Sequence, residues 1–166
     1  MKKLVWSAAA LALVVAFGAT PAHAGSYKYV GSKKCKMCHK KAYKAWQNSK
    51  HAHAFSALEK AGAADKPECV KCHTTGYPGS GPVSAKQKNV QCERCHGPGS
   101  GYFKVMMKRK SYTREKAVAA GLILPDMQGK FCTENCHNKQ SPNFKPFNFE
   151  ERWAQIKHTL DKPRAH

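Results

Sequence analysis

The chain has 166 residues, a length that suits one domain, and its 29 basic and 10 acidic residues give a formal charge of +19. Apolar residues make up 42% and aromatic residues 10%, which excludes a disordered chain. The single long apolar run lies at the N-terminus and is shorter than a typical transmembrane helix, which excludes a polytopic membrane protein.

Residues 1–24 predict a secretory signal peptide. Two lysines precede an apolar run, and a small-x-small pattern ends at Ala24, after which we expect cleavage. An uncleaved membrane anchor is the alternative. The next residue is Gly25 rather than cysteine, so a lipoprotein anchor at this site is excluded. We therefore expect a periplasmic protein whose single domain spans residues 25–166.

The remaining sequence predicts short helices separated by long loops. Residues 40–61 carry apolar side chains at steps of three and four, which predicts a helix. Glycine and proline mark residues 74–91 and 97–101 as loops. Two further helices are expected, from the N-cap Thr113 to Ala120 and over residues 149–160 after Asn148. No segment alternates as a strand does, so we predict a mostly α fold with long loops and little or no sheet.

All eight cysteines occur in pairs, and a histidine follows the second cysteine of every pair. Three pairs read C-x-x-C-H, and the fourth has one additional residue between its cysteines. We number these motifs 1 to 4 in chain order. Their cysteines are Cys35 and Cys38, Cys69 and Cys72, Cys92 and Cys95, and Cys132 and Cys136; their histidines are His39, His73, His96 and His137.

This pattern predicts covalently attached haem. Two thiols one helical turn apart can bond to the two vinyl groups of a porphyrin, and the adjacent histidine then becomes the proximal iron ligand. Cys69 to Cys95 also fit the spacing of a zinc ribbon, but neither zinc nor a disulfide framework requires a histidine after each pair. We expect four covalent haems; for the longer motif 4, a disulfide between Cys132 and Cys136 is the alternative.

Four haems on so short a chain must form much of its core and lie close to one another. A chain of closely packed haems conducts electrons, so we expect an electron carrier. Assembly into a conductive filament is a structural alternative.

The second axial ligand of each iron decides what the haem can do. Two histidines saturate the iron and favour electron transfer, whereas an open position allows a small molecule to bind and be reduced. The candidates outside the motifs are His51, His53, His158, the terminal His166, Met106 and Met107.

The sequence resembles the cytochrome c-554 family of periplasmic tetrahaem proteins. The resemblance rests on motif 1 followed by Ser49-Lys50-His51-Ala52, on the run from Cys69 to Tyr77, on Cys92 to Gly99, and on motif 4 with the downstream Ile156-Lys157-His158. It implies a mostly helical fold with haems in stacked pairs, three with two histidine ligands and one five-coordinate.

The resemblance also implies individual ligands. His51 would bind the haem of motif 4, His158 would bind the haem of motif 3, and the haem of motif 2 would be open. The family places a histidine for the haem of motif 1 shortly after motif 3, but residues 101–107 contain none. His53 is therefore a candidate there, beside a methionine or no ligand. The family's relation to nitrogen-cycle oxidoreductases makes a reductase of nitric oxide, nitrite or hydroxylamine the alternative function.

The positive charge predicts acidic redox partner proteins or an anionic membrane surface. Nucleic acid is not expected as a partner of an exported protein. One run of basic residues surrounds motif 1, and a second lies at residues 104–110.

Overall fold

A computed structural model describes residues 27–126 and 128–158, and the predicted signal peptide and His166 lie outside them. The described chain folds into short helices. In order they are α1 (Ser32–Lys36), α2 (Lys40–Gln47), the 3-10 helix η1 (Lys50–His53), α3 (Ala54–Lys60), α4 (Pro67–His73), α5 (Cys92–His96), α6 (Ser100–Met107), the 3-10 helix η2 (Arg109–Ser111), α7 (Arg114–Ala119), α8 (Lys130–Asn135) and α9 (Phe149–Ile156).

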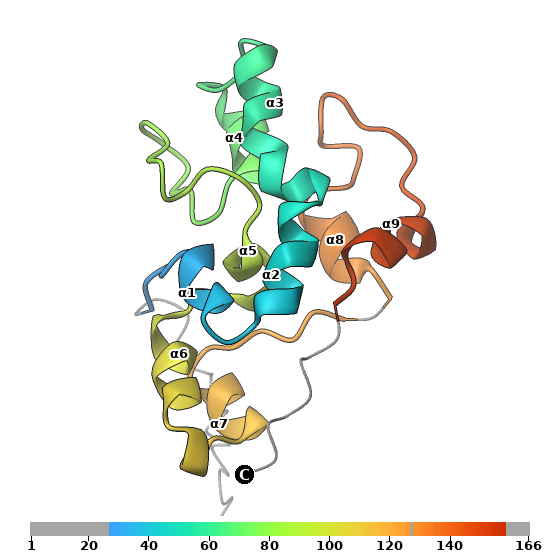
Figure 1. The fold of residues 1–166 in the computed structure, drawn as a ribbon. Coiled ribbons are helices and arrows are strands. Elements are labelled where there is room, and N and C mark those ends of the chain that lie inside the picture. Colours follow the sequence, from blue (N-terminus) through green and yellow to red (C-terminus); the bar gives the residue numbers. More distant parts are fainter. Residues whose placement is uncertain (1–26, 127, 159–166) are drawn as a thin grey trace, which may run out of the picture.

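The helices spread along an elongated body (Figure 1). Helices α3 and α4 form one end, α6 and α7 form the other, and α1, α2 and α5 lie between them. Helices α8 and α9 flank the middle on one side. The β pairing within the described residues consists of one isolated antiparallel bridge between Thr74 and Lys88. This confirms the predicted mostly α fold.

The prediction of a single helix over residues 40–61 is wrong, because the helix is interrupted at Asn48 and Ser49. Ser49 is extended, with φ −88° and ψ 157°, and its hydroxyl donates to the Trp46 carbonyl at 2.7 Å. The Trp46 indole N–H in turn donates to the Val90 carbonyl at 2.8 Å, which ties the end of α2 to a distant segment. Serine competes for backbone groups in this way and so ends helices. The break separates α2 from η1, which carries His51.

Both predicted N-caps are confirmed. The Thr113 hydroxyl accepts from the Lys116 N–H at 3.2 Å, and the Asn148 side-chain oxygen accepts from the Glu151 N–H at 3.2 Å. The helix predicted over residues 149–160 ends at Ile156, because Lys157 turns to an extended conformation. Helix α6 begins at Ser100, inside the loop predicted at residues 97–101, so that loop is shorter than expected.

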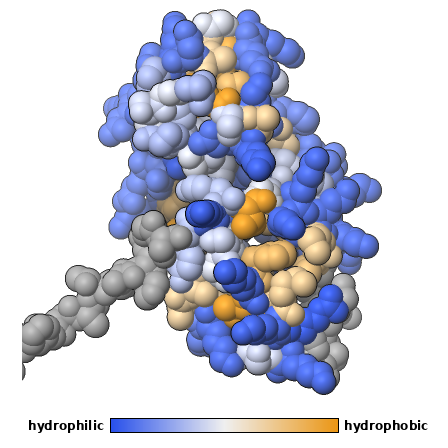
Figure 2. All heavy atoms as spheres, turned by 90° about the vertical axis from the view of Figure 1, so that its left-hand side faces the viewer, coloured by the Kyte–Doolittle hydropathy of each residue, from blue (hydrophilic) through white to orange (hydrophobic). Residues whose placement is uncertain are grey.

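The side-chain core is small. The buried hydrophobic residues of the described chain are Ala52, Phe55, Leu58, Ala63, Val70, Tyr102 and Ala117. The cluster among them joins α3 to α4 and has Phe55, Leu58 and Val70 at its centre. On the face shown in Figure 2, hydrophilic residues surround separate hydrophobic patches. Across residues 27–126 and 128–158, the helices lack the combined length and hydropathy that a membrane span requires.

Candidate functional site

Each of the four motifs lies on or at the end of a short helix. Helix α1 carries Cys35, α4 and α5 contain motifs 2 and 3 completely, and α8 carries Cys132. Pro67 begins α4, where its fixed φ and missing N–H are compatible with the first turn. All eight cysteines are half-buried, and none of them is paired in a disulfide. The helical turns thus hold both thiols of a motif next to its histidine.

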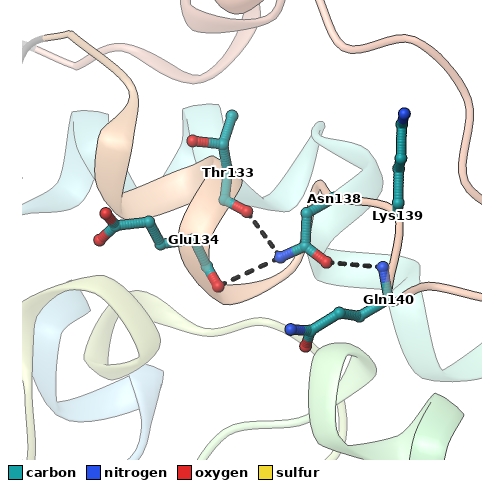
Figure 3. A pocket seen from close by; sticks show the side chains of 5 residues that line it. All are labelled: Thr133, Glu134, Asn138, Lys139 and Gln140. Atoms are coloured by element: carbon teal, nitrogen blue, oxygen red, sulfur yellow. Dashed lines mark hydrogen bonds between the residues drawn. The ribbon is translucent and has the colours of Figure 1, made fainter.

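Motif 4 takes up its additional residue at the end of α8. The N–H groups of Cys136 and His137 both donate to the Cys132 carbonyl, at 3.1 and 3.0 Å. The Asn138 amide then donates to the carbonyls of Thr133 and Glu134, at 2.6 and 3.1 Å, as Figure 3 shows. These bonds satisfy carbonyls that the helix end leaves open, so the longer spacing ends in an ordered turn. The same turn lines a shallow depression, together with Lys139 and Gln140.

Buried hydrogen bonds join motif 1 to motif 3. The Glu93 carboxylate is 1% exposed and accepts from the N–H groups of Val30, Gly31 and Gly99, at 2.8, 2.7 and 2.7 Å. The Gln91 side-chain oxygen accepts from the Ser32 N–H at 2.9 Å. Because Val30 and Gly31 lead into α1, which starts at Ser32, and Glu93 lies within α5 directly after Gln91, these bonds fix the two motif helices against each other.

Thiols from different motifs are in contact. Cys35 shares a hydrogen bond with Cys92, which raises the pKa of Cys35 and lowers that of Cys92. Cys72 and Cys136 share another, which raises the pKa of Cys72 and lowers that of Cys136. Motif 1 therefore adjoins motif 3, and motif 2 adjoins motif 4. In the described chain no three His, Cys, Asp or Glu side chains gather as a metal site, unlike the cysteines of a zinc ribbon.

Two motif histidines face histidines from distant segments. The ring centres of His51 and His137 are 6.2 Å apart, and those of His96 and His158 are 6.0 Å apart. A metal–imidazole bond is about 2.0–2.1 Å and the nitrogen lies about 1.1 Å from its ring centre, so two imidazoles on one iron have centres about 6.2–6.4 Å apart. Both pairs fit a haem iron between them. The roles of these histidines as iron ligands stay predictions.

Backbone and aromatic contacts orient three motif histidines. His73 Nδ1 lies 2.6 Å from the Ala54 carbonyl oxygen, and His96 Nδ1 lies 3.1 Å from that of Ile123. Such a bond fixes the tautomer and leaves the other ring nitrogen for a metal. The His137 ring stacks on Phe147 with centres 4.1 Å apart.

Electrostatics favour the neutral imidazole that iron requires. Burial is the main cause that lowers the pKa of His51, His96 and His137. Neighbouring histidines lower the pKa of all three further, as Arg152 does for His137. A neutral imidazole is the state that binds a metal.

The other candidate ligands occupy different environments. His53 is exposed, and its Nε2 lies 3.1 Å from the Gln47 carbonyl oxygen. Met106 is half-buried and Met107 is 48% exposed, both on α6. The ligand of the motif 1 haem therefore stays open among the candidates named from the sequence.

A positively charged side chain, Arg94, lies beside motif 4. Arg94, between the cysteines of motif 3, points a guanidinium N–H at the Cys136 sulfur, with the nitrogen 3.6 Å away. Its Nε is buried and has no hydrogen-bond partner among the described residues. A haem carries propionates that could accept from such a group. The paired thiols, the facing imidazoles and this arginine together fit covalent haem.

Four of these residues were not singled out from the sequence: Gln91, Glu93, Arg94 and Asn138. A buried acid or amide looks like a solvated side chain in a sequence. The position of Glu93 and Arg94 inside motif 3 was the available signal, because residues between attached cysteines lie next to a haem.

Comparisons with known proteins agree with this geometry. Residues 34–97 match the family described as "Cytochrome c554 and c-prime". The solved structure of the reduced state of cytochrome c554 from Nitrosomonas europaea is similar, with a TM-score of 0.54 and 26% sequence identity; the match covers 82% of this chain and 81% of that one. The curated proteins give no significant match.

Proposed function

We propose that this chain, whose residues 34–97 match the family of cytochrome c554, is a multihaem c-type cytochrome that carries electrons between redox partners through four closely packed haem c groups. Haem supplies the one-electron chemistry, and the chain's residues attach, orient and enclose it. The eight motif cysteines would hold the four porphyrins, and His39, His73, His96 and His137 would be the proximal ligands.

The observation that carries this proposal is the spacing of the two facing histidine pairs. Rings from segments far apart in the sequence stand at the separation of two ligands on one iron, 6.2 Å for His51 with His137 and 6.0 Å for His96 with His158. Saturated irons exchange electrons without binding substrate. The thiol contacts between motifs 1 and 3 and between motifs 2 and 4 support short distances for electron transfer.

We place the protein in the periplasm, after cleavage of the signal peptide, and assign it acidic redox partners. Lys33, Lys34, Lys36, Lys40 and Lys41 are all exposed around motif 1, and we call these five residues the basic patch. Long-range attraction to an acidic protein would speed its encounter with the haem of motif 1. An anionic membrane surface is the alternative partner.

A second candidate function is the reduction of a small nitrogen compound at an open haem on motif 2. A cleft of about 820 Å³ lies between α3, α4 and the loop at residues 76–83, and Val70 of motif 2 lines it. Glu59, Asp65 and Lys88 line the same cleft and could provide protons. Lys88 and Glu59 form an ion pair of 2.6 Å there.

Electron paramagnetic resonance of the purified ferric protein, with haem counted on the same sample, tests both functions. Four haems, all low-spin, would support the carrier and exclude an open iron. A high-spin signal of about one haem would favour the reductase, to be followed by assays with nitric oxide, nitrite and hydroxylamine. A protein without haem would contradict both functions.

A further inference from the structure

The two residues between the cysteines of motif 3 have opposite charges and contact different motifs. Glu93 lies on the side of motif 1, where its carboxylate is 1% exposed. Arg94 lies on the side of motif 4, where its guanidinium reaches the Cys136 sulfur. These two consecutive residues of α5 thus place a buried negative group and a half-buried positive group beside different motifs.

The surroundings of Glu93 suit a carboxylate. Its three partners are the N–H groups of Val30, Gly31 and Gly99, and an ionised carboxylate can only accept. The negative charge therefore lies between the start of α1, which carries Cys35, and α5, which carries motif 3. Burial keeps solvent and salt from screening this charge.

Arg94 has the opposite effect on the other pair of motifs. Its guanidinium nitrogen lies 3.6 Å from the Cys136 sulfur of motif 4, whose neighbour His137 is the predicted iron ligand. The buried Nε lacks a hydrogen-bond partner among residues 27–126 and 128–158, so it can donate to a haem propionate, and in that pair the guanidinium offsets negative charge beside motif 4. Glu93 therefore influences the contact of motifs 1 and 3, and Arg94 that of motifs 2 and 4.

We propose that Glu93 and Arg94 set a difference in reduction potential along the haem array, with Glu93 favouring the ferric state beside Cys35 and Arg94 favouring the ferrous state beside Cys136. Reduction adds one negative charge to a haem, so a nearby anion opposes it and a nearby cation assists it. Electrons are then held preferentially at motifs 2 and 4. The inference rests on the proposed function, because it requires haem at these motifs.

The test is a spectroelectrochemical titration of the haem-loaded protein, comparing wild type with Glu93→Gln and Arg94→Gln. We expect Glu93→Gln to favour reduction of some haems by about tenfold in the equilibrium constant, or about 59 mV for one electron. Arg94→Gln should disfavour reduction of different haems by a similar factor. Arg114→Gln and Glu115→Gln are the matched controls, because these adjacent residues on α7 carry opposite charges and are exposed. We expect each control to change the constants by less than about twofold.

Further variants separate charge from hydrogen bonding. Glu93→Asp and Arg94→Lys keep the charges and should keep the wild-type potentials. Gln91→Met removes the bond to the Ser32 N–H without a change of charge, so it should lower stability and leave the potentials unchanged. If Glu93→Gln does not load haem, the reduction potentials of the Arg94 variants and of Glu93→Asp test the inference instead.

Two results would overturn the inference in a fully loaded protein: shifts no larger than those of the controls, or shifts of the same haems in the same direction by both variants. Wild-type protein that binds no haem would instead refute the proposed function. Counting haem in every sample therefore distinguishes the two failures.

Discussion

The His51 ring lies with its centre 6.2 Å from that of His137, although 86 residues separate them in the sequence. The break at Ser49 makes this possible, because it ends α2 and starts the separate turn η1 that carries His51. The Val90 N–H donates to the His51 carbonyl at 3.1 Å and fixes that turn from the other side.

This geometry predicts that His51→Ala opens one iron. The ferric protein should gain a high-spin resonance signal of about one haem, with an unchanged haem count, because the thioethers remain. His53→Ala is the matched control two residues away, and its exposed ring should be removable without a new high-spin signal. A signal from His53→Ala would instead make His53 an iron ligand.

The basic patch around motif 1 predicts a salt-dependent reaction with anionic oxidants. Ferrous protein should be oxidised by ferricyanide more slowly as salt rises, because the attraction is screened. A double variant with Lys36→Glu and Lys40→Glu should lower the low-salt oxidation rate about tenfold in stopped-flow measurements. The variant Lys60→Glu, at an exposed position on α3, is the control. Equal rates for all three proteins would show that electrons leave elsewhere.

Asn138 predicts a local contribution to stability. Asn138→Ala removes two side-chain hydrogen bonds to carbonyls at the end of α8 and the one that its oxygen accepts from the Gln140 N–H, which should cost about 0.5–1.5 kcal/mol in the free energy of unfolding. Denaturant unfolding measures this change. Lys139→Ala, at an exposed neighbouring position, should be neutral. Equal stability of both variants would mean that the turn of motif 4 is held by haem attachment alone.

We predict that protonation of Asp126 makes the folded protein less stable in acid. Its carboxylate accepts from the N–H groups of Phe131, Lys130 and Gln128, at 2.7, 3.0 and 3.0 Å, and these bonds lower its pKa below the ordinary 3.8. A lowered pKa in the folded state gives stability that is present above about pH 3.8 and is lost as pH falls through the folded value. Thermal unfolding of wild type and Asp126→Ala should therefore differ at pH 6 and converge near pH 2. A constant difference over this range would contradict the assignment.

Local patterns predicted the helical class and both side-chain N-caps, because Thr113 and Asn148 act on N–H groups three residues away. The break at Ser49 escaped prediction because it depends on Trp46 and its partner Val90, far along the chain. The four motifs were recognisable because cysteine and histidine are rare and their spacing is fixed by haem. The hydrogen bonds by which Gln91 and Glu93 hold α1 against α5 could not be predicted, because their partners are backbone N–H groups that carry no sequence signature.

The hydrogen bonds that Glu93 accepts from Val30 and Gly31 span 63 and 62 residues of sequence. Contacts of such separation close large loops and form late in folding. A chain that leaves a membrane pore with its N-terminus first would expose motif 1 long before residue 93 emerges. If haem is attached to the exported chain, as we propose, the thiols of motif 1 would be accessible before these hydrogen bonds form, and their formation would mark the end of assembly at that motif.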